Sequence, residues 1–285
     1  FNKFAVGDFG AALAISNEVI DLSPECLATE IAPAMALRGL VQVYCGDTVD
    51  GSRTLTAGIE LTRALHPVGF ASLQMYAGVL AAMGLLDAET LVPDARSAWL
   101  GAESFGDLCG IIMARWAYGT VLVRTPGGRR EGIALLERAR TSVHECRLGA
   151  CGLAIISTDL AVDRTRDGAL DGAITELRAT FDTHLTGFPV FAVFPAEALV
   201  QLLVRRAGGG DIAEAKQVLD RWRERGIDVP ALDLCLLRGR ALIARAEGDA
   251  GAYGRFAGEY LALCERLNAV GRLDEARQMT LAATG

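Results

Sequence analysis

Lysine is almost absent from this sequence of 285 residues, since only Lys3 and Lys216 occur and arginine carries nearly all the positive charge. Acidic residues outnumber basic ones by 35 to 28, which gives a net charge of -7. Phosphate backbones are bound by clusters of basic side chains, and an excess of acid opposes such contacts. The composition therefore predicts no direct nucleic-acid partner.

Long uncharged apolar runs are also missing, although 51% of the residues are hydrophobic. A membrane-spanning helix needs about 20 consecutive apolar residues, and the most apolar segment, residues 188–204, contains Glu197 and two prolines. No secretory leader is evident, and seven cysteines, an odd number, are typical of buried thiols in a reducing compartment. We therefore expect a cytoplasmic protein with reduced cysteines and no membrane partner. Because the chain opens at Phe1 inside an expected helix, we expect it to be a fragment of a longer protein.

Motifs that carry a reaction are likewise scarce. The glycine clusters at residues 127–128 and 208–210 are not followed by the lysine and serine or threonine of a phosphate-binding loop. His144, Cys146 and Cys151 lie close in sequence and suggest a metal site. However, the first two are two residues apart on an expected helix and so face different directions, and nothing nearby supplies a fourth zinc ligand. We predict a surface histidine and packed thiols here.

Three aspartates spaced by four residues, Asp159, Asp163 and Asp167, share one face of an expected helix and could hold a divalent cation, as in all-helical synthases. The alternative is an exposed face on which Arg164 and Arg166 neutralise them. No second acidic motif is present to complete a metal site, so we favour the alternative. The sequence predicts no catalytic residue, no metal and no cofactor.

What the sequence does contain is a regular series of glycines. Their spacings, by subtraction, are 39, 38, 43, 41, 42 and 38 residues: Gly7, Gly46, Gly84, Gly127, Gly168, Gly210 and Gly248. A period near 40 fits a pair of helices with two short turns. Small residues recur five positions after this glycine and seven positions before it, which predicts close helix pairs: Ala12, Gly51, Gly132, Ala173 and Ala215 after it, and Gly39, Ala77, Ala161 and Ala241 before it.

The clearest copy of the pattern follows Gly210. This glycine can adopt the left-handed conformation that ends a helix, and Asp211 and Glu214 can form a capping box for the next one. Applied to every copy, the pattern predicts helices and no strands: 8–22, 32–45, 47–65, 68–83, 88–102, 105–123, 129–146, 148–164, 169–185, 190–207, 211–225, 231–246, 249–267 and 273–282. Pro93 either kinks the fifth of these or marks its true start.

Gly-Asp with small residues at these two positions resembles the tetratricopeptide repeat, although the period exceeds the 34 residues of that family and its aromatic and Leu-Gly signature is missing. Closer in character are the longer, irregular arrays at the C-terminal end of large bacterial ATP-binding signalling regulators, some joined to a nucleotide cyclase and some to a DNA-binding helix-turn-helix. Residues 259–277 are similar to the terminal helices of such proteins. The resemblance implies one all-α domain over residues 1–285, a right-handed superhelix (solenoid) of about seven helical hairpins.

In such arrays the first helix of each pair lines a concave surface. Aromatic and arginine side chains dominate recognition surfaces, so we expect the ligand site on the fourth to sixth pairs and on Arg238. The candidates are Arg115, Trp116, Tyr118, Phe191, Phe194, Gln201, Arg205 and Arg238. For the cluster of Phe188, Phe191 and Phe194 the favoured alternative is core packing.

The function expected from these observations is a non-catalytic module that binds a protein, a peptide or a small effector. It would pass that event to ATPase, cyclase or DNA-binding parts of the same polypeptide. The alternatives are a free-standing scaffold for protein complexes and, more remotely, an all-helical metal-dependent enzyme.

Overall fold

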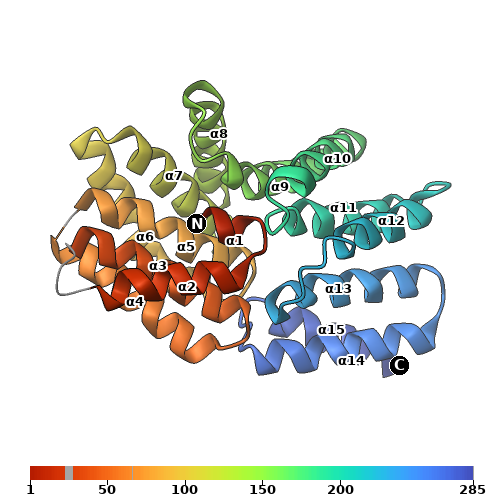
Figure 1. Cartoon of the computed structure of the whole chain (residues 1–285). Coiled ribbons are helices and arrows are strands. Elements are labelled where there is room, and N and C mark those ends of the chain that lie inside the picture. The colour runs from red at the N-terminus through yellow and green to blue at the C-terminus, as the bar shows by residue number, and fades with distance from the viewer. Residues whose placement is uncertain (23–27, 66, 285) are drawn as a thin grey trace.

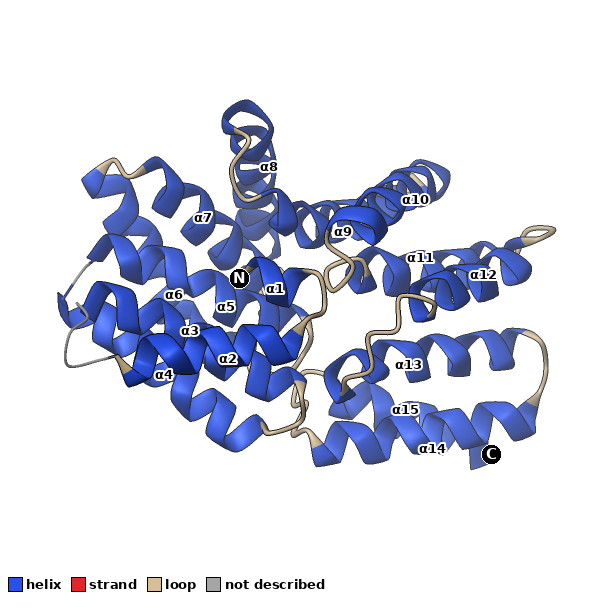
Figure 2. Cartoon of the chain, viewed as in Figure 1, coloured by secondary structure: helices blue, strands red, loops and turns tan. Residues whose placement is uncertain are grey.

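The computed structural model describes residues 1–22, 28–65 and 67–284, and this part of the chain is helical throughout, with no strand (Figure 2). It contains fifteen α-helices and two short 3-10 helices. In chain order they are α1 (Asn2–Ala5), α2 (Phe9–Asp21), α3 (Ala28–Tyr44), α4 (Thr48–Leu65), α5 (Pro67–Ala82), α6 (Ala88–Phe105), α7 (Leu108–Leu122), α8 (Arg129–Cys146), η1 (Ala150–Gly152), α9 (Leu153–Arg164), η2 (Thr165–Asp167), α10 (Leu170–Gly187), α11 (Val193–Arg206), α12 (Asp211–Arg223), α13 (Pro230–Ala246), α14 (Ala250–Arg266) and α15 (Leu273–Thr284). The all-α prediction is confirmed. None of the described helices has the length and apolar character needed to cross a membrane.

The turn glycines behave as their spacing predicts. All seven have positive φ, between 72° and 100°, and each separates the two helices of a hairpin, from α1–α2 to α13–α14. Aspartates after three of these glycines accept a hydrogen bond from an amide in the first turn of the following helix, namely Asp8, Asp47 and Asp249. The helices pack mostly with their neighbours in the chain, as expected of an array of hairpins.

The predicted capping box at Asp211 is wrong. Helix α12 begins at Asp211 itself, with Gly210 at its N-cap and no side-chain cap. The carboxylate of Asp211 instead accepts two bonds from Arg206, at 2.9 and 2.6 Å, and one from the amide of Gly208 at 2.8 Å. A bidentate pair with a guanidinium is stronger than a bond to a neutral amide. Glu214 likewise does not cap the helix, because both of its carboxylate oxygens accept hydrogen bonds from Arg178.

Small residues near the turns let paired helices approach closely, as predicted. A Cβ on Gly39 of α3 would lie 2.4 Å from the amide nitrogen of Leu55 and 2.5 Å from the carbonyl oxygen of Gly51 in α4. Gly132 of α8 is equally confined, since its Cβ would lie 2.9 Å from the backbone of α7 at Gly119. At these two crossings backbone packs directly on backbone, which only glycine allows.

Several helix boundaries differ from the predictions by a few residues; helix α3, for example, begins at Ala28 and not at residue 32. Helix α9 begins at Leu153 after the turn η1, and not near residue 148. Helix α6 runs without interruption from Ala88 to Phe105 across Pro93. Pro93 therefore does not mark the start of that helix. A proline near the N-terminal end removes only one intrahelical donor, which the following turns outweigh.

The array does not extend as an open rod but turns back on itself (Figure 1). The first helices of six hairpins, α3, α5, α7, α9, α11 and α13, each contact the next, and α13 returns to contact α3. These six helices form a ring, and the second helices of the hairpins surround it. In Figure 1 the blue hairpin α13–α14 accordingly lies beside the red and orange helices of the N-terminal half. The period of the repeat predicts each hairpin but not this closure.

Aromatic side chains fill one side of the ring. The ring of Phe4 in α1 lies 5.0 Å from that of Tyr44 and 6.1 Å from that of Phe191, and the ring of Phe1 lies 6.0 Å from that of Tyr76. The amide of Val190 donates to the carbonyl of α1 at Ala5, at 3.3 Å. The short helix α1 thus covers this side of the ring and leaves the opposite side open.

Candidate functional site

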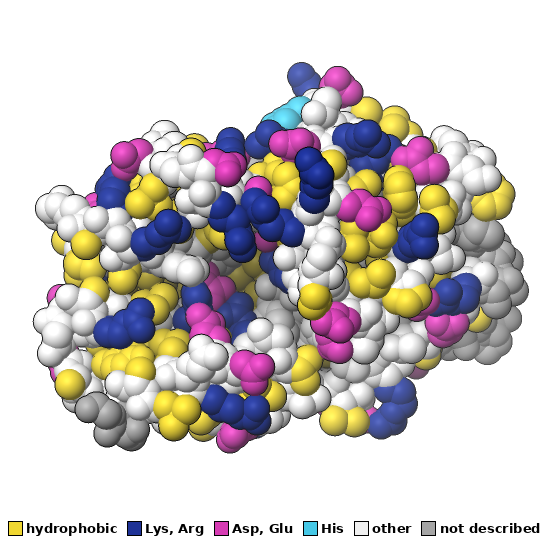
Figure 3. Space-filling view, turned by 180° about the vertical axis from the view of Figure 1, so that it is seen from behind, with side chains coloured by type: hydrophobic (Ala, Val, Ile, Leu, Met, Phe, Trp, Pro, Cys, Tyr) yellow, Lys and Arg dark blue, Asp and Glu magenta, His cyan; other side chains and the backbone are white. Residues whose placement is uncertain are grey.

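On the side away from α1 the centre of the ring is hollow (Figure 3). The hollow has a volume of about 880 Å³ and is lined by five hairpins, from the third to the seventh, and by the start of α15. Its walls come from the α5–α6 turn and the flanking helix ends (Ala81, Ala82, Gly84, Leu86, Asp87, Ala88, Glu89), the α7–α8 turn and the start of α8 (Val123, Arg124, Arg129, Ile133), α9 and η2 (Thr158, Asp159, Val162, Asp163, Arg166), α11 (Phe194, Glu197, Ala198, Gln201), α13 (Arg238) and the α14–α15 turn with the start of α15 (Val270, Gly271, Arg272, Asp274, Glu275).

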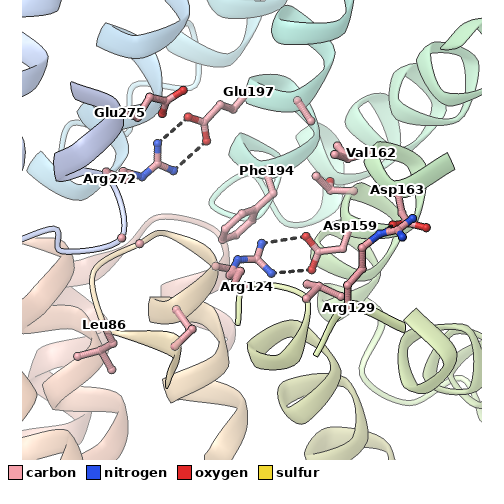
Figure 4. Close-up of a pocket in the computed structure, with 18 of the residues that line it drawn as sticks. Leu86, Arg124, Arg129, Asp159, Val162, Asp163, Phe194, Glu197, Arg272 and Glu275 are labelled. Carbon is pink, nitrogen blue, oxygen red and sulfur yellow. Dashed lines mark hydrogen bonds and ion pairs between the residues drawn. The ribbon is translucent and has the colours of Figure 1, made fainter. Parts of the chain in front are cut away.

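One wall carries two ion pairs that join α9 to the α7–α8 turn and to the start of α8. The guanidinium of Arg124 donates two bonds of 2.8 Å to the carboxylate of Asp159, and Arg129 pairs with Asp163 (Figure 4). Asp159 and Asp163 lie on α9 and both line the hollow, as their spacing predicts, whereas Asp167 lies in η2 beyond the end of that helix and outside the lining. The prediction that Arg164 and Arg166 neutralise them is wrong, because the partners come from the preceding hairpin and Arg164 bonds to Glu176.

The opposite wall centres on Glu197 of α11, whose side chain is only 13% exposed. Arg272 donates to both of its carboxylate oxygens, at 2.6 and 2.9 Å, and Arg238 approaches it at 3.4 Å. Burial would raise the pKa of Glu197, but the charges of Arg272 and Arg238 outweigh burial and lower the pKa to about 2. Glu197 is therefore a stable carboxylate across the physiological range.

Arg238 extends this wall toward the mouth of the hollow. It forms two bonds of 2.8 Å with Glu275 and one of 3.3 Å with the side-chain oxygen of Gln201. Burial alone would lower the pKa of Arg238, yet Glu197 and Glu275 raise it above its ordinary value. The guanidinium is held between two carboxylates and remains charged.

Arg272 also closes the ring. Its Nε donates to the carbonyl of Met83 just past the end of α5, 189 residues earlier in the chain. Beside it, the amide of Gly271 donates to the carbonyl of Gly84 at 3.1 Å. The same side chain that holds Glu197 in the hollow therefore ties the last hairpin to the third.

Between the two walls lies Phe194 (Figure 4), together with smaller apolar groups that include Ala81 and Ala198. Phe194 is buried in the hydrophobic core beneath. The hollow thus combines an apolar base with charged walls, the combination found in ligand pockets.

The charged groups of the lining do not balance. It contains five arginines and seven carboxylates, a difference of -2, and four of the arginines are paired with a carboxylate: Arg124, Arg129, Arg238 and Arg272. Such pairs hold both charges in place. Four of the five arginines of this surface therefore already have a carboxylate partner within the protein and offer little charge to a ligand.

The structure brings three of the eight predicted site residues, Phe194, Gln201 and Arg238, into the hollow. Arg115 and Arg205 lie outside its lining. Arg115 bonds to Glu103 at 2.6 Å and to Ser142 at 3.3 Å, and Arg205 bonds to Thr165 at 3.2 Å.

The other three predicted residues, Trp116, Tyr118 and Phe191, are buried in the core. Trp116 is 1% exposed and packs against Gly152, and Tyr118 stacks on Trp99 with ring centroids 5.6 Å apart. Phe191 lies in the aromatic cluster under α1. The phenylalanine cluster therefore serves as core here, the alternative that the sequence favoured. Ligand contact by these three side chains stays a prediction, and their burial argues against it.

Sequence reasoning missed Arg124, Arg129 and Arg272 as parts of the site. Two signals pointed toward it: the i, i+4 spacing of Asp159 and Asp163, and the isolated Glu197 in the most apolar segment of the chain. An acid in such a segment requires a buried partner. That partner, Arg272, lies 75 residues away, so local patterning cannot identify it.

No group of three or more histidine, cysteine or acidic side chains within the described ranges is arranged to hold a metal ion. The described cysteines are free thiols. His144 is exposed, and Cys146 and Cys151 are partly buried.

The chain matches no known family model, and a search of curated proteins found no relative. The function of the hollow is therefore argued from its geometry.

Proposed function

We propose that this protein is a non-catalytic binding module whose hollow receives a peptide, a segment of a protein partner or a small effector. We further propose that the hairpins form a tetratricopeptide-like right-handed superhelix, closed after about one turn, and that binding is passed to other domains of the same polypeptide. The observation that carries the proposal is the hollow itself, where segments from five hairpins meet around an apolar base.

A ligand in this position would contact elements far apart in the chain at the same time. The α5–α6 turn, α9, α11 and the α14–α15 turn all reach the hollow, and Arg272 links three of them through Met83 and Glu197. Binding there would favour one arrangement of the hairpins over others in proportion to the difference in contacts. This is the property a regulatory module requires.

The chemistry of the lining favours binding over catalysis. General acid and base catalysis at neutral pH needs a group whose pKa lies near 7. Glu197, a largely buried acid of the lining, has a pKa of about 2, and the pKa values of Arg238 and Arg272 are raised. Among the described residues that line the hollow, Thr158 alone has a hydroxyl, and it donates to the carbonyl of Ala154 at 2.6 Å. A free-standing scaffold, the second function expected from the sequence, would differ in carrying no effector domain, which the length of the open reading frame decides.

The proposal is tested by filling the hollow. Val162 lines it, is 36% exposed and can therefore be replaced by tryptophan with little effect on the core. The matched control is Val49→Trp on α4, where valine is 71% exposed and outside the hollow. Ligands are first selected for the wild type from a library of short random peptides and a panel of metabolites. Val162→Trp should abolish their binding and Val49→Trp should leave it unchanged. Equal binding by both variants, with helix content intact, would refute the proposal.

A further inference from the structure

The proposed function leaves open what kind of ligand the hollow accepts, and its charges bear on this question. The sequence predicts arginines among the recognition residues, and free arginines would favour an anionic ligand. In the structure four of the five arginines in the lining are neutralised by carboxylates of the same lining. Of these five arginines, only Arg166 has no such partner among the carboxylates of the lining.

Three carboxylates of the lining are paired with none of its arginines, and they lie at the mouth. Asp87 and Glu89 belong to the start of α6, and Asp274 belongs to the start of α15. All three side chains are exposed, and the two turns that carry them are held side by side by the bond between Gly271 and Gly84. Asp274 has one partner, Arg277, at 3.5 Å on the same exposed helix face, a pair of little strength.

Helix dipoles do not cancel this excess. The starts of α6 and α8 contribute partial positive charge, and the ends of α5 and α7 contribute partial negative charge at the same two turns. The start of α15 adds partial positive charge and the end of α9 adds partial negative charge at two other places in the lining. These contributions offset each other, so the side chains decide the sign of the potential.

The hollow also shows how it binds a guanidinium, because two of its own arginines are bound in the same way. Arg272 contacts a carboxylate, Glu197, and the carbonyl of Met83 just beyond the end of α5. Arg124 contacts a carboxylate, Asp159, and the carbonyl of Thr120 in the last turn of α7, at 2.8 Å. Both cases combine an acid with the negative end of a helix, the two groups that favour a planar cation.

We infer that the hollow recognises a ligand with closely spaced cationic groups, and that this ligand is an arginine-rich peptide segment. The inference rests on the proposed function, since it concerns the same hollow. The apolar base at Phe194 and Ala198 receives the aliphatic parts of the segment, and Asp87, Glu89 and Asp274 bind its guanidinium groups. Small polyamines share the chemistry of closely spaced cations, but their ammonium groups cannot form the bidentate pairs seen on both walls.

The test measures binding of a fluorescent oligoarginine peptide to the full chain by anisotropy, at low and at moderate salt. Asp87→Asn, Glu89→Gln and Asp274→Asn are combined in one variant, in which the asparagine retains the cap that Asp87 provides. We expect the affinity to fall roughly tenfold, since three exposed charge contacts each contribute modestly. The wild-type affinity should also weaken with salt.

The control variant removes the same number of charges from exposed acids outside the hollow: Glu18→Gln, Asp220→Asn and Asp228→Asn. It should bind oligoarginine like the wild type. Equal weakening of both variants would show that the peptide senses only the net charge and would overturn the inference. Absence of binding to the wild type at low salt would overturn it as well.

Two further arms separate this inference from the proposed function and from its close alternative. If an oligoglutamate peptide binds and Val162→Trp abolishes that binding, the hollow is a ligand site but the cationic inference is wrong. Spermine should bind more weakly than oligoarginine. Tighter binding of spermine that depends on the same three carboxylates would confirm cation recognition and overturn the assignment to a peptide.

Discussion

Replacing Glu197 by glutamine tests the ion pair that joins the hollow to the ring closure. The substitution keeps the size of the side chain but leaves Arg272 and Arg238, both 8% exposed, without their shared charge partner. A fall in the pKa of Glu197 from 4.5 to about 2 corresponds to about 3 kcal/mol, since a tenfold change in proton affinity is worth about 1.4 kcal/mol. Breaking a buried pair by removing one partner costs about 3 to 5 kcal/mol, a consistent range.

The lowered pKa of Glu197 also determines how the free energy of unfolding depends on pH. Because the carboxylate of Glu197 is favoured in the folded state, its stabilisation is complete above the unfolded pKa and is lost as the pH falls from about 4.5 toward 2. Urea unfolding followed by circular dichroism at pH 7 and at pH 3 measures this change. The wild type should lose more stability on acidification than Glu197→Gln does, so the two should converge at low pH.

The exposed carboxylate of Glu145 on α8 supplies the control. Glu145→Gln should change the unfolding free energy by less than about 0.5 kcal/mol, as is usual for surface positions. If Glu197→Gln matched that control at pH 7 and kept the acid sensitivity of the wild type, the reasoning about the ring-closing pair would be refuted.

Three other substitutions test the packing. Gly39→Ala should destabilise the protein by about 1 to 3 kcal/mol in urea unfolding, because the new Cβ would lie 2.4 Å from the backbone of Leu55. The control Gly10→Ala, whose Cβ would meet nothing within 4 Å, should be neutral or stabilising. Similar unfolding free energies for the two variants would contradict the account of the α3–α4 crossing. Gly84→Ala should lower the free energy of unfolding by at least about 1 kcal/mol, because the glycine has φ of +72° and a Cβ there would lie 2.8 Å from Arg272, which closes the ring. An unchanged unfolding midpoint would argue against that contact. Trp116→Ala should lower the unfolding free energy by about 3 to 5 kcal/mol as a core truncation; a variant of normal stability that binds no ligand would restore Trp116 as a recognition residue.

The hairpins could be predicted because their signals are local. A turn glycine with positive φ, a following helix cap and a small residue at the crossing all lie within a few residues of each other, as around Gly46, Asp47 and Gly51. Side chains at such positions depend little on the rest of the fold. The same locality explains the error at Asp211, where the competing partner Arg206 belongs to the preceding helix and offers a stronger bond than an amide does.

The ring and its hollow could not be predicted in this way. Closure depends on contacts such as that between Arg272 and Met83, which no repeat period encodes. The burial of Trp116 had a visible signal, because residues 108–122 are apolar on nearly every side, a pattern typical of a helix surrounded by others. Helix α7 indeed contacts α5, α6, α8 and α9, which leaves its aromatic side chains no open face.

The central claim, that the hollow receives the ligand, is tested most directly by amide hydrogen exchange of the full chain with and without a peptide selected for binding. We predict slower exchange at three places distant in sequence, the α5–α6 turn, the α7–α8 turn and the α14–α15 turn, because one ligand in the hollow reaches all of them. Outer grooves also exist, such as the one between α13 and α14 that is lined by Leu236 and Leu263. Protection confined to that groove, with unchanged exchange at the three turns, would contradict the claim.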